Sequence, residues 1–157
     1  MIHRKARIRN DRYKQKARYK MVKDYLRSVR NLNKEIEAKK KHRESLYYLV
    51  TGSSIKIKTV NVQESAPDDK LAAVMAEVDE LDRKISDDII KLTAKQAKAL
   101  EMINSVSKSE YRSLLIHYYL NAYSWDKTAS MLGYSIQHIF RMHGEALREL
   151  DEKDESK

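Results

Sequence analysis

The sequence predicts an all-α fold in which a long helical hairpin precedes a C-terminal helix-turn-helix. Only three glycines and one proline occur among 157 residues, a composition that favours long helices. Apolar residues recur at steps of three and four over much of the chain, as on one face of a helix. In the last third, serine caps and a glycine have the spacing of short helices joined by a tight turn.

The composition argues against an enzyme or a membrane protein. The absence of cysteine excludes disulfides, thiolate metal sites and thiol nucleophiles. The five histidines lack the HExxH spacing, and no partnered nucleophile or carboxylate pair lies near them, so we expect no catalytic residue, metal or cofactor. No apolar run approaches the roughly 18 residues that span a bilayer, and no signal peptide is evident. We therefore expect a soluble, cytoplasmic protein with no membrane partner.

Positive charge is concentrated near the N-terminus. The net charge is +9, but residues 1–58 alone carry net +14, and the rest of the chain is slightly acidic. The predicted phosphate-binding arm, residues 1–18, contains Arg4, Lys5, Arg7, Arg9, Arg12, Lys14, Lys16 and Arg18. Such an arm favours a phosphate-bearing partner through counterion release, although it could equally be a solvated helix face or bind anionic lipid. We expect it to add affinity for DNA to a C-terminal segment that is itself nearly neutral.

Two apolar stripes predict the helices of the hairpin, over residues 19–106. The first has a polar centre and consists of Val22, Leu26, Val29, Asn33, Ile36, Lys40, Arg43, Tyr47 and Val50. The second predicts a helix from about Asp69 to Ser105 and consists of Leu71, Val74, Val78, Leu81, Ile85, Ile89, Leu92, Gln96, Ala99, Ile103 and Val106. Their opposite net charges favour antiparallel packing as a coiled coil. The hairpin could serve as support alone or as a homodimer interface.

Residues 51–68 are predicted to link the two helices. They contain Gly52, Ser53, Ser54 and the only proline, Pro67, residues at which a chain turns. Ile55, Ile57, Val60 and Val62 partly alternate with polar residues, as in a strand. Because the sequence offers no second strand to pair with them, we expect an ordered loop.

The C-terminal domain is predicted over residues 107–150, followed by an acidic tail at 151–157. Ser107 and Glu110 have the spacing of a capping box, which predicts a helix from Lys108 to about Asn121. The inward residues of this helix should be Leu114, Leu115, Tyr118 and Tyr119. Ser124 is predicted to cap the next helix, whose first residue, Trp125, is expected in the core.

The segment from Trp125 to Leu150 has the residues that a helix-turn-helix requires. Ala129 is small where the second helix presses on the first, Gly133 allows the positive φ that ends the first helix, and Ile139 supplies a branched anchor. Ser135 is expected to cap the second helix, and Leu132, Tyr134 and Met142 to fill the remaining inward positions. The alternative is an ordinary αα-hairpin, but caps, turn and anchor agree on a helix-turn-helix.

The outward face of the second helix carries the predicted DNA-binding residues. In a helix-turn-helix this face enters the major groove. Gln137 could read adenine, Arg141 guanine or phosphate, and Ile136 or Phe140 a thymine methyl. His138 is expected to face phosphate, whereas His143 is expected to be a half-buried packing residue. The predicted set is Ser135, Ile136, Gln137, His138, Phe140, Arg141 and Lys127.

A family resemblance points the same way. The segment SxxEYRSLLIHYYLNAYSWDKTASMLGYSIQHIFRMHGEALREL resembles region 4 of σ70-type factors as it occurs in phage ArpU/RinA-like late transcription activators of Gram-positive bacteria. Upstream, YKMVKDYLRSVRNLNKEIEAKKKHRESLYYL and VNVQESAPDD are similar to the hairpin and linker of these proteins. The resemblance covers about residues 19–150, so the basic arm lies outside it.

The resemblance implies a sequence-specific activator of late or packaging genes that binds a promoter, with host RNA polymerase as a further partner, in the cytoplasm of a bacterial host. It places Ile136, Gln137, Phe140 and Arg141 toward the groove and Ser135 near the DNA backbone. Two of these base-reading positions are apolar here, so the target sequence cannot be transferred. The chain also lacks a promoter-melting segment like region 2 of σ factors. Two alternatives stay open, a small terminase-like DNA-packaging subunit and a helical adaptor protein.

Overall fold

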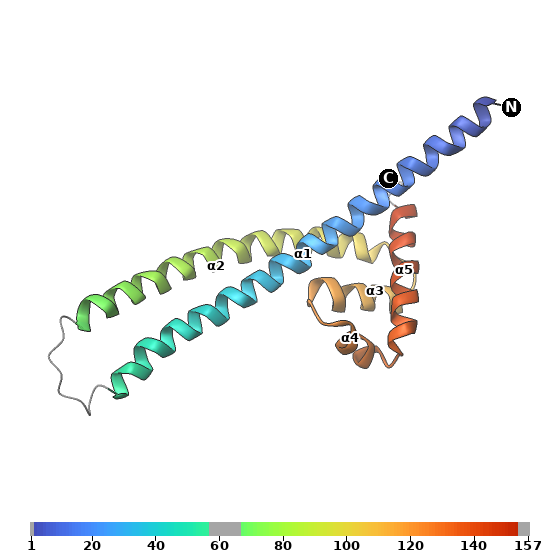
Figure 1. Cartoon of the computed structure of the whole chain (residues 1–157). Coiled ribbons are helices and arrows are strands. Elements are labelled where there is room, and N and C mark those ends of the chain that lie inside the picture. Colours follow the sequence, from blue (N-terminus) through green and yellow to red (C-terminus); the bar gives the residue numbers. More distant parts are fainter. Residues whose placement is uncertain (1, 57–66, 154–157) are drawn as a thin grey trace. The chain divides into compact units, whose positions relative to one another are not determined.

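A computed structural model describes the backbone of residues 2–56 and 67–153, and the side chains of residue 17, residues 19–49 and residues 69–152. Every regular element in these ranges is a helix (Figure 1), which confirms the predicted all-α class. The elements are α1 (Ile2–Lys56), α2 (Pro67–Asn104), α3 (Ser109–Leu115), the π-helix η2 (Ile116–Leu120), α4 (Trp125–Leu132) and α5 (Ile136–Lys153). None of these helices has an apolar stretch that could cross a bilayer.

The first helix is longer than the sequence predicts. Its backbone is helical from Ile2, so residues 2–18 of the predicted arm belong to α1, and the side chains of the eight basic arm residues lie outside the described residues. At its other end α1 continues through Gly52 to Lys56, where the sequence predicts a linker from Thr51. One glycine costs a helix only about 1 kcal/mol, which does not by itself end it.

The second helix begins with Pro67, close to the predicted start at Asp69. Proline is favoured at this position because the amide it lacks would have no partner inside the helix. The helix ends at Asn104, one residue before the predicted end. Residues 57–66, with the partly alternating Ile57, Val60 and Val62, lie outside the described residues.

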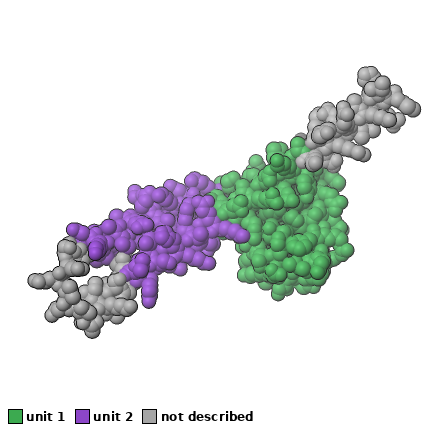
Figure 2. All heavy atoms as spheres, viewed as in Figure 1, with its two compact units in different colours: residues 1–33, 93–157 green, residues 34–92 purple. Residues whose placement is uncertain are grey.

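The chain divides into two compact units (Figure 2). Unit 1 comprises Met1–Asn33 and Thr93–Lys157, and unit 2 comprises Lys34–Leu92. Helices α1 and α2 each contribute one part to each unit. Unit 1 contains all of α3, η2, α4 and α5, and therefore all residues predicted to read DNA bases.

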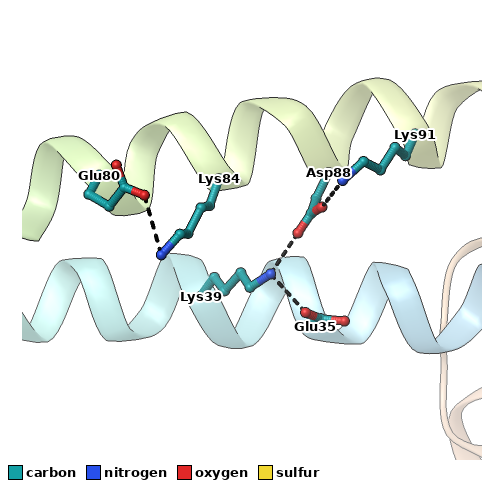
Figure 3. A network of polar contacts seen from close by, with 6 residues as sticks. All are labelled: Glu35, Lys39, Glu80, Lys84, Asp88 and Lys91. Carbon is teal, nitrogen blue, oxygen red and sulfur yellow. Dashed lines mark hydrogen bonds and ion pairs between the residues drawn. The ribbon is translucent and has the colours of Figure 1, made fainter.

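In unit 2, α1 and α2 run antiparallel and are held by apolar and ionic contacts. Ile36, Leu46, Val78 and Ile85 are buried. Nζ of Lys39 lies 2.6 Å from Oδ2 of Asp88 and 2.7 Å from Oε1 of Glu35, and Lys91 bonds the other oxygen of Asp88 at 3.1 Å (Figure 3). The Lys39 hydrogen bond is the main cause that lowers the pKa of Asp88. A second interhelical pair joins Arg43 to Asp82 at 2.8 Å.

These contacts correct the predicted stripes at several positions. Ile89 is 41% exposed, whereas its neighbour Asp88 is buried. Tyr47 and Leu71, also assigned to the stripes, are exposed. The stripe of α2 is displaced at Ile89 because an aspartate that pairs with Lys39 takes the inward position.

In unit 1, α1 and α2 contribute to the core around α3, η2, α4 and α5. Val22, Leu26 and Val29 of α1 and Ala99 and Ile103 of α2 are buried, as predicted. The core is completed by further side chains that are almost fully buried, namely Leu114, Leu115, Tyr119, Ile139 and Leu147. The inward residues predicted for the helix from Lys108 to Asn121, which is α3 and η2 in the structure, are therefore buried, except that Tyr118 is only half-buried.

Three polar side chains satisfy the carbonyl groups at the end of η2. Nδ2 of Asn33 and Nε2 of Gln96 both donate to the Leu120 carbonyl, at 2.6 and 3.2 Å, and the Arg30 guanidinium donates to the Tyr118 carbonyl. The last carbonyls of a helix lack partners within the helix. Asn33 and Gln96 interrupt the apolar stripes because they bond this helix end.

Candidate nucleic-acid interface

The helix before the candidate site begins later than the sequence predicts. α3 starts at Ser109, and its N-cap, Lys108, makes no side-chain capping bond. The predicted Ser107–Glu110 capping box is therefore wrong. The Ser107 amide instead donates to the carboxylate of Glu149, and Arg112 donates to the carbonyls of Val106 and Ser107, each at 2.7 Å. A contact from Glu149, distant in sequence, thus takes the amide that the predicted box would have bound, and Arg112 binds the neighbouring carbonyls.

The predicted caps and turn between α4 and α5 are present. Oγ of Ser124 accepts from the Lys127 amide at 3.1 Å and begins α4. Gly133 ends α4 in the left-handed region, with φ 72° and ψ 28°, a conformation that glycine adopts without steric cost. Oγ of Ser135 accepts from the His138 amide at 3.3 Å and caps α5.

The side of α4 and α5 that faces the core is buried. Ala129 of α4 and Ile139 and Met142 of α5 are buried, as predicted, and so are Ala146 and Leu147. Two predicted inward residues differ, because Leu132 is only half-buried and Tyr134 is 39% exposed. The Tyr134 ring lies against the imidazole of His138, with centroids 4.8 Å apart.

The outward face of α5 starts in its first turn. Gln137 and Arg141 are exposed, Phe140 is 49% exposed, and Ile136 and His138 are half-buried. Nη2 of Arg141 lies 2.6 Å from Nδ1 of His138, which links two members of the predicted set. Ser135 is exposed at the N-terminal end of this face. The structure therefore brings six of the seven predicted base- and phosphate-contacting residues together, while Lys127 lies on α4.

Lys127 has a different environment. Its ammonium nitrogen lies 3.9 Å from the centroid of the Tyr123 ring, a cation–π geometry. The side chain is exposed in the first turn of α4. Lys127 therefore lies at the N-terminal end of α4 instead of on α5.

A series of stacked groups supports one edge of the outward face. The Arg30 guanidinium lies 4.0 Å from the centroid of the Tyr118 ring, Tyr118 stacks on Trp125 at 3.6 Å, and Trp125 meets Phe140 edge to face at 5.1 Å. Phe140 is therefore exposed but braced, and Trp125 is half-buried rather than fully in the core. Such aromatic pairs contribute about 0.5–1.5 kcal/mol beyond their buried area.

The other edge of the outward face of α5 is polar. A pocket of about 300 Å³ is lined by Lys108, Glu110, Tyr111, Tyr134, His138, Arg141, Met142 and Glu145. The Tyr111 hydroxyl donates to Glu145 and accepts from Lys108 at 3.1 Å. The Tyr111 hydrogen bond is the main cause that lowers the pKa of Glu145, so this carboxylate stays charged. The negative charge at this edge is thus partnered by groups of the protein itself.

Sequence reasoning missed the groups that support the interface from behind, chiefly Arg30, Asn33, Gln96 and the Tyr118–Trp125 stack. The signal available was the presence of polar residues inside otherwise apolar stripes. No set of three or more histidine and acidic side chains in the described part of the chain is arranged to hold a metal ion.

The fold and this surface define a class of small proteins, helical throughout their described regular elements, in which α5 exposes Gln137, Phe140 and Arg141. The chain belongs to the family described as "Protein of unknown function (DUF1492)", which matches residues 49–151 and is found in phage proteins. The match covers α2 to α5, apart from the last residues of α5, and only the end of α1. No curated protein and no solved structure matches the chain.

Proposed function

We propose that this protein is a phage-type, sequence-specific DNA-binding transcription regulator, and that α4, the Gly133 turn and α5 form a σ70 region 4-like helix-turn-helix. We further propose that it activates late or packaging genes at a promoter together with host RNA polymerase. The observation that supports DNA binding best is the division of α5 into two faces. Ile139 and Met142 anchor one face, while Gln137 and Arg141 are exposed on the other.

The exposed residue types suit the edges of base pairs. The major groove, about 12 Å wide, admits an α-helix, and glutamine and arginine can bond adenine and guanine with two hydrogen bonds each. Phe140, braced by Trp125, offers a firm apolar surface for a thymine methyl group. The contact of Arg141 with His138 limits the freedom that the guanidinium would lose on binding, which reduces the entropic cost.

The charge distribution supplies the non-specific part of the affinity. In unit 1, α1 exposes Lys20 and Arg27 beside the half-buried Lys23, and the eight cations of residues 1–18 precede them. Each phosphate that a cation neutralises releases counterions and adds salt-dependent affinity. Helices α4 and α5 would then provide the sequence preference, and the cations of α1 would provide most of the electrostatic attraction to DNA.

Selection from a pool of random 30-base-pair duplexes tests this proposal with the full-length chain. We expect the wild-type protein to enrich a defined sequence, and fluorescence anisotropy then measures affinity for that sequence and for a scrambled one. Gln137→Ala should reduce affinity for the selected sequence by about tenfold and reduce discrimination, since a bidentate base contact contributes about 1–3 kcal/mol. Arg141→Ala should also reduce affinity, through the loss of a contact to phosphate or guanine. Arg83→Ala, a charge-matched control on the exposed surface of unit 2, should change neither.

Three outcomes would contradict the proposal. Unaltered sequence preference in Gln137→Ala together with unaltered affinity in Arg141→Ala would exclude α5 as the reading helix. Absence of binding to any duplex at low salt would favour a helical adaptor protein. A ring of eight or more subunits in light scattering would favour a small terminase-like packaging subunit over a regulator.

A further inference from the structure

Gly144 lies inside α5, about two turns beyond its first residue, Ile136. Glycine in a helix interior is unfavourable relative to alanine, because it loses more backbone freedom on folding. Gly133 has a conformational reason to be glycine, since its φ is +72°, but Gly144 has no such left-handed conformation.

Packing within the protein does not require this glycine either. A Cβ atom built on Gly144 would meet no heavy atom within 4 Å. The space beside its α-carbon is open, so an alanine would fit there without any movement of the protein. Neither the backbone conformation nor the packing of the described residues accounts for a glycine at this place.

The position of Gly144 on the helix suggests why a glycine is present there. Residues three and four apart lie on one helix face, and Arg141 and Arg148 are three before and four after Gly144. Both arginines are exposed, and Nε of Arg148 donates to the Gly144 carbonyl at 3.2 Å. The bare backbone at Gly144 thus lies between two guanidinium groups on the outward face. The adjacent carboxylate, Glu145, is engaged by Tyr111.

We propose that the backbone of α5 at Gly144 is a close-approach site for the sugar-phosphate backbone of DNA, with Arg141 and Arg148 on either side of the phosphate. The inference rests on the proposed function and extends it to the DNA strand at the edge of the groove. Glycine is used where a backbone must approach a ligand closely, and arginine binds phosphate through two parallel hydrogen bonds.

The length of α5 agrees with this placement. With a rise of 1.5 Å per residue, Gly144 lies about 12 Å along the helix from Ile136. The major groove has a width of about 12 Å, so a helix whose first turns lie in the groove reaches its phosphate-lined edge near Gly144. Gln137 would then read bases, and Gly144 would set how deeply α5 enters the groove.

Substitution at Gly144 should affect stability and binding in opposite directions. Gly144→Ala should raise the Tm of the free protein by about 2–4 °C, because alanine is the better helix former. The same change should weaken DNA binding, and the longer side chain of Gly144→Gln should weaken it by about tenfold or more. Both losses should be similar on selected and scrambled duplexes, since phosphate contacts carry no sequence information. Ala94→Gln, at an exposed helical position of α2 in unit 1, adds the same side chain and should leave binding unchanged.

The test separates this inference from the proposed function. If Gly144→Gln binds the selected duplex as tightly as wild type while Gln137→Ala still alters sequence preference, the close-approach site is wrong and the DNA-reading role of α5 stands. A lower Tm in Gly144→Ala would also overturn it, because the protein's own fold would then require the glycine. If the wild-type chain binds no duplex, both proposals fail.

Discussion

The hydroxyl of Tyr119 lies 2.9 Å from Nε2 of His143, and this hydrogen bond joins η2 to α5 inside unit 1. His143 also contacts Trp125 edge to face, with ring centroids 4.9 Å apart. Burial raises the pKa of Tyr119. Burial also lowers the pKa of His143 to about 4, and the positive charges of Lys23 and Arg27 lower it further. Both groups are therefore neutral in the folded protein at neutral pH.

This pair predicts that acid destabilises unit 1. The pKa of His143 is about 4 in the folded protein, against 6.5 for an ordinary histidine. The unfolded chain therefore binds the proton more tightly, and stability falls as the pH drops from about 6.5 to about 4. Between pH 7.5 and 5.0 we expect a loss of about 2 kcal/mol. Denaturant unfolding, followed by the fluorescence of Trp125, the only tryptophan, measures it. His143→Gln should remove this pH dependence, whereas His42→Gln, at an exposed site, should retain it.

Gly133 should tolerate other residues less well than Gly144 does. Because its φ is +72°, Gly133→Ala forces a Cβ into the left-handed region and should reduce the free energy of unfolding by about 1–2 kcal/mol. Gly133→Asn should cost less, since asparagine adopts this conformation more readily. Chemical denaturation monitored at Trp125 provides the comparison. Equal stability of the alanine variant and wild type would contradict the left-handed turn.

The Lys39–Asp88 ion pair in unit 2 should be stabilising only as a pair. Lys39→Leu leaves a buried carboxylate with Lys91 as its remaining partner, and Asp88→Leu leaves Lys39 with Glu35, so each single change should lower the thermal midpoint. The double variant should recover most of this loss, because paired replacement of a buried ion pair by apolar groups is often neutral. A thermal melt followed by circular dichroism completes the double-mutant cycle. Additive losses in the double variant would show that the two residues do not act together.

Charge in residues 1–18 should control the salt dependence of DNA binding. Replacing the eight cations by glutamine removes up to eight phosphate contacts, so the slope of log affinity against log salt should fall by as much as about 7. Sequence preference should persist, because it depends on α5. Anisotropy titrations at several salt concentrations measure the slope. A slope identical to that of wild type would exclude these residues from the DNA contact.

The candidate site could be predicted in part because its elements depend on neighbouring residues. Ser124 and Ser135 cap α4 and α5, and Gly133 takes the left-handed conformation, as expected from bonds that span only a few positions. The same local reasoning failed at Ser107, where Glu149, 42 residues away in sequence, takes the amide that a local cap would bind. It also failed at Tyr134, whose ring lies on His138 instead of in the core.

By itself, the sequence determined the all-helical class, the bounds of α2 and α4, the start of α5, and which side of α5 faces inward. These properties follow from apolar periodicity and local hydrogen bonds, which act over one or two helical turns. The predicted acidic tail at 151–157 was wrong at its start, because α5 continues to Lys153 and Asp151 is buried. Only the tertiary structure decided that Asn33 and Gln96 would bond the Leu120 carbonyl, that Asp88 would be buried in place of Ile89, and that Trp125 would brace Phe140. Each of these contacts joins separate helices, so its energy depends on distances that a one-dimensional pattern does not contain.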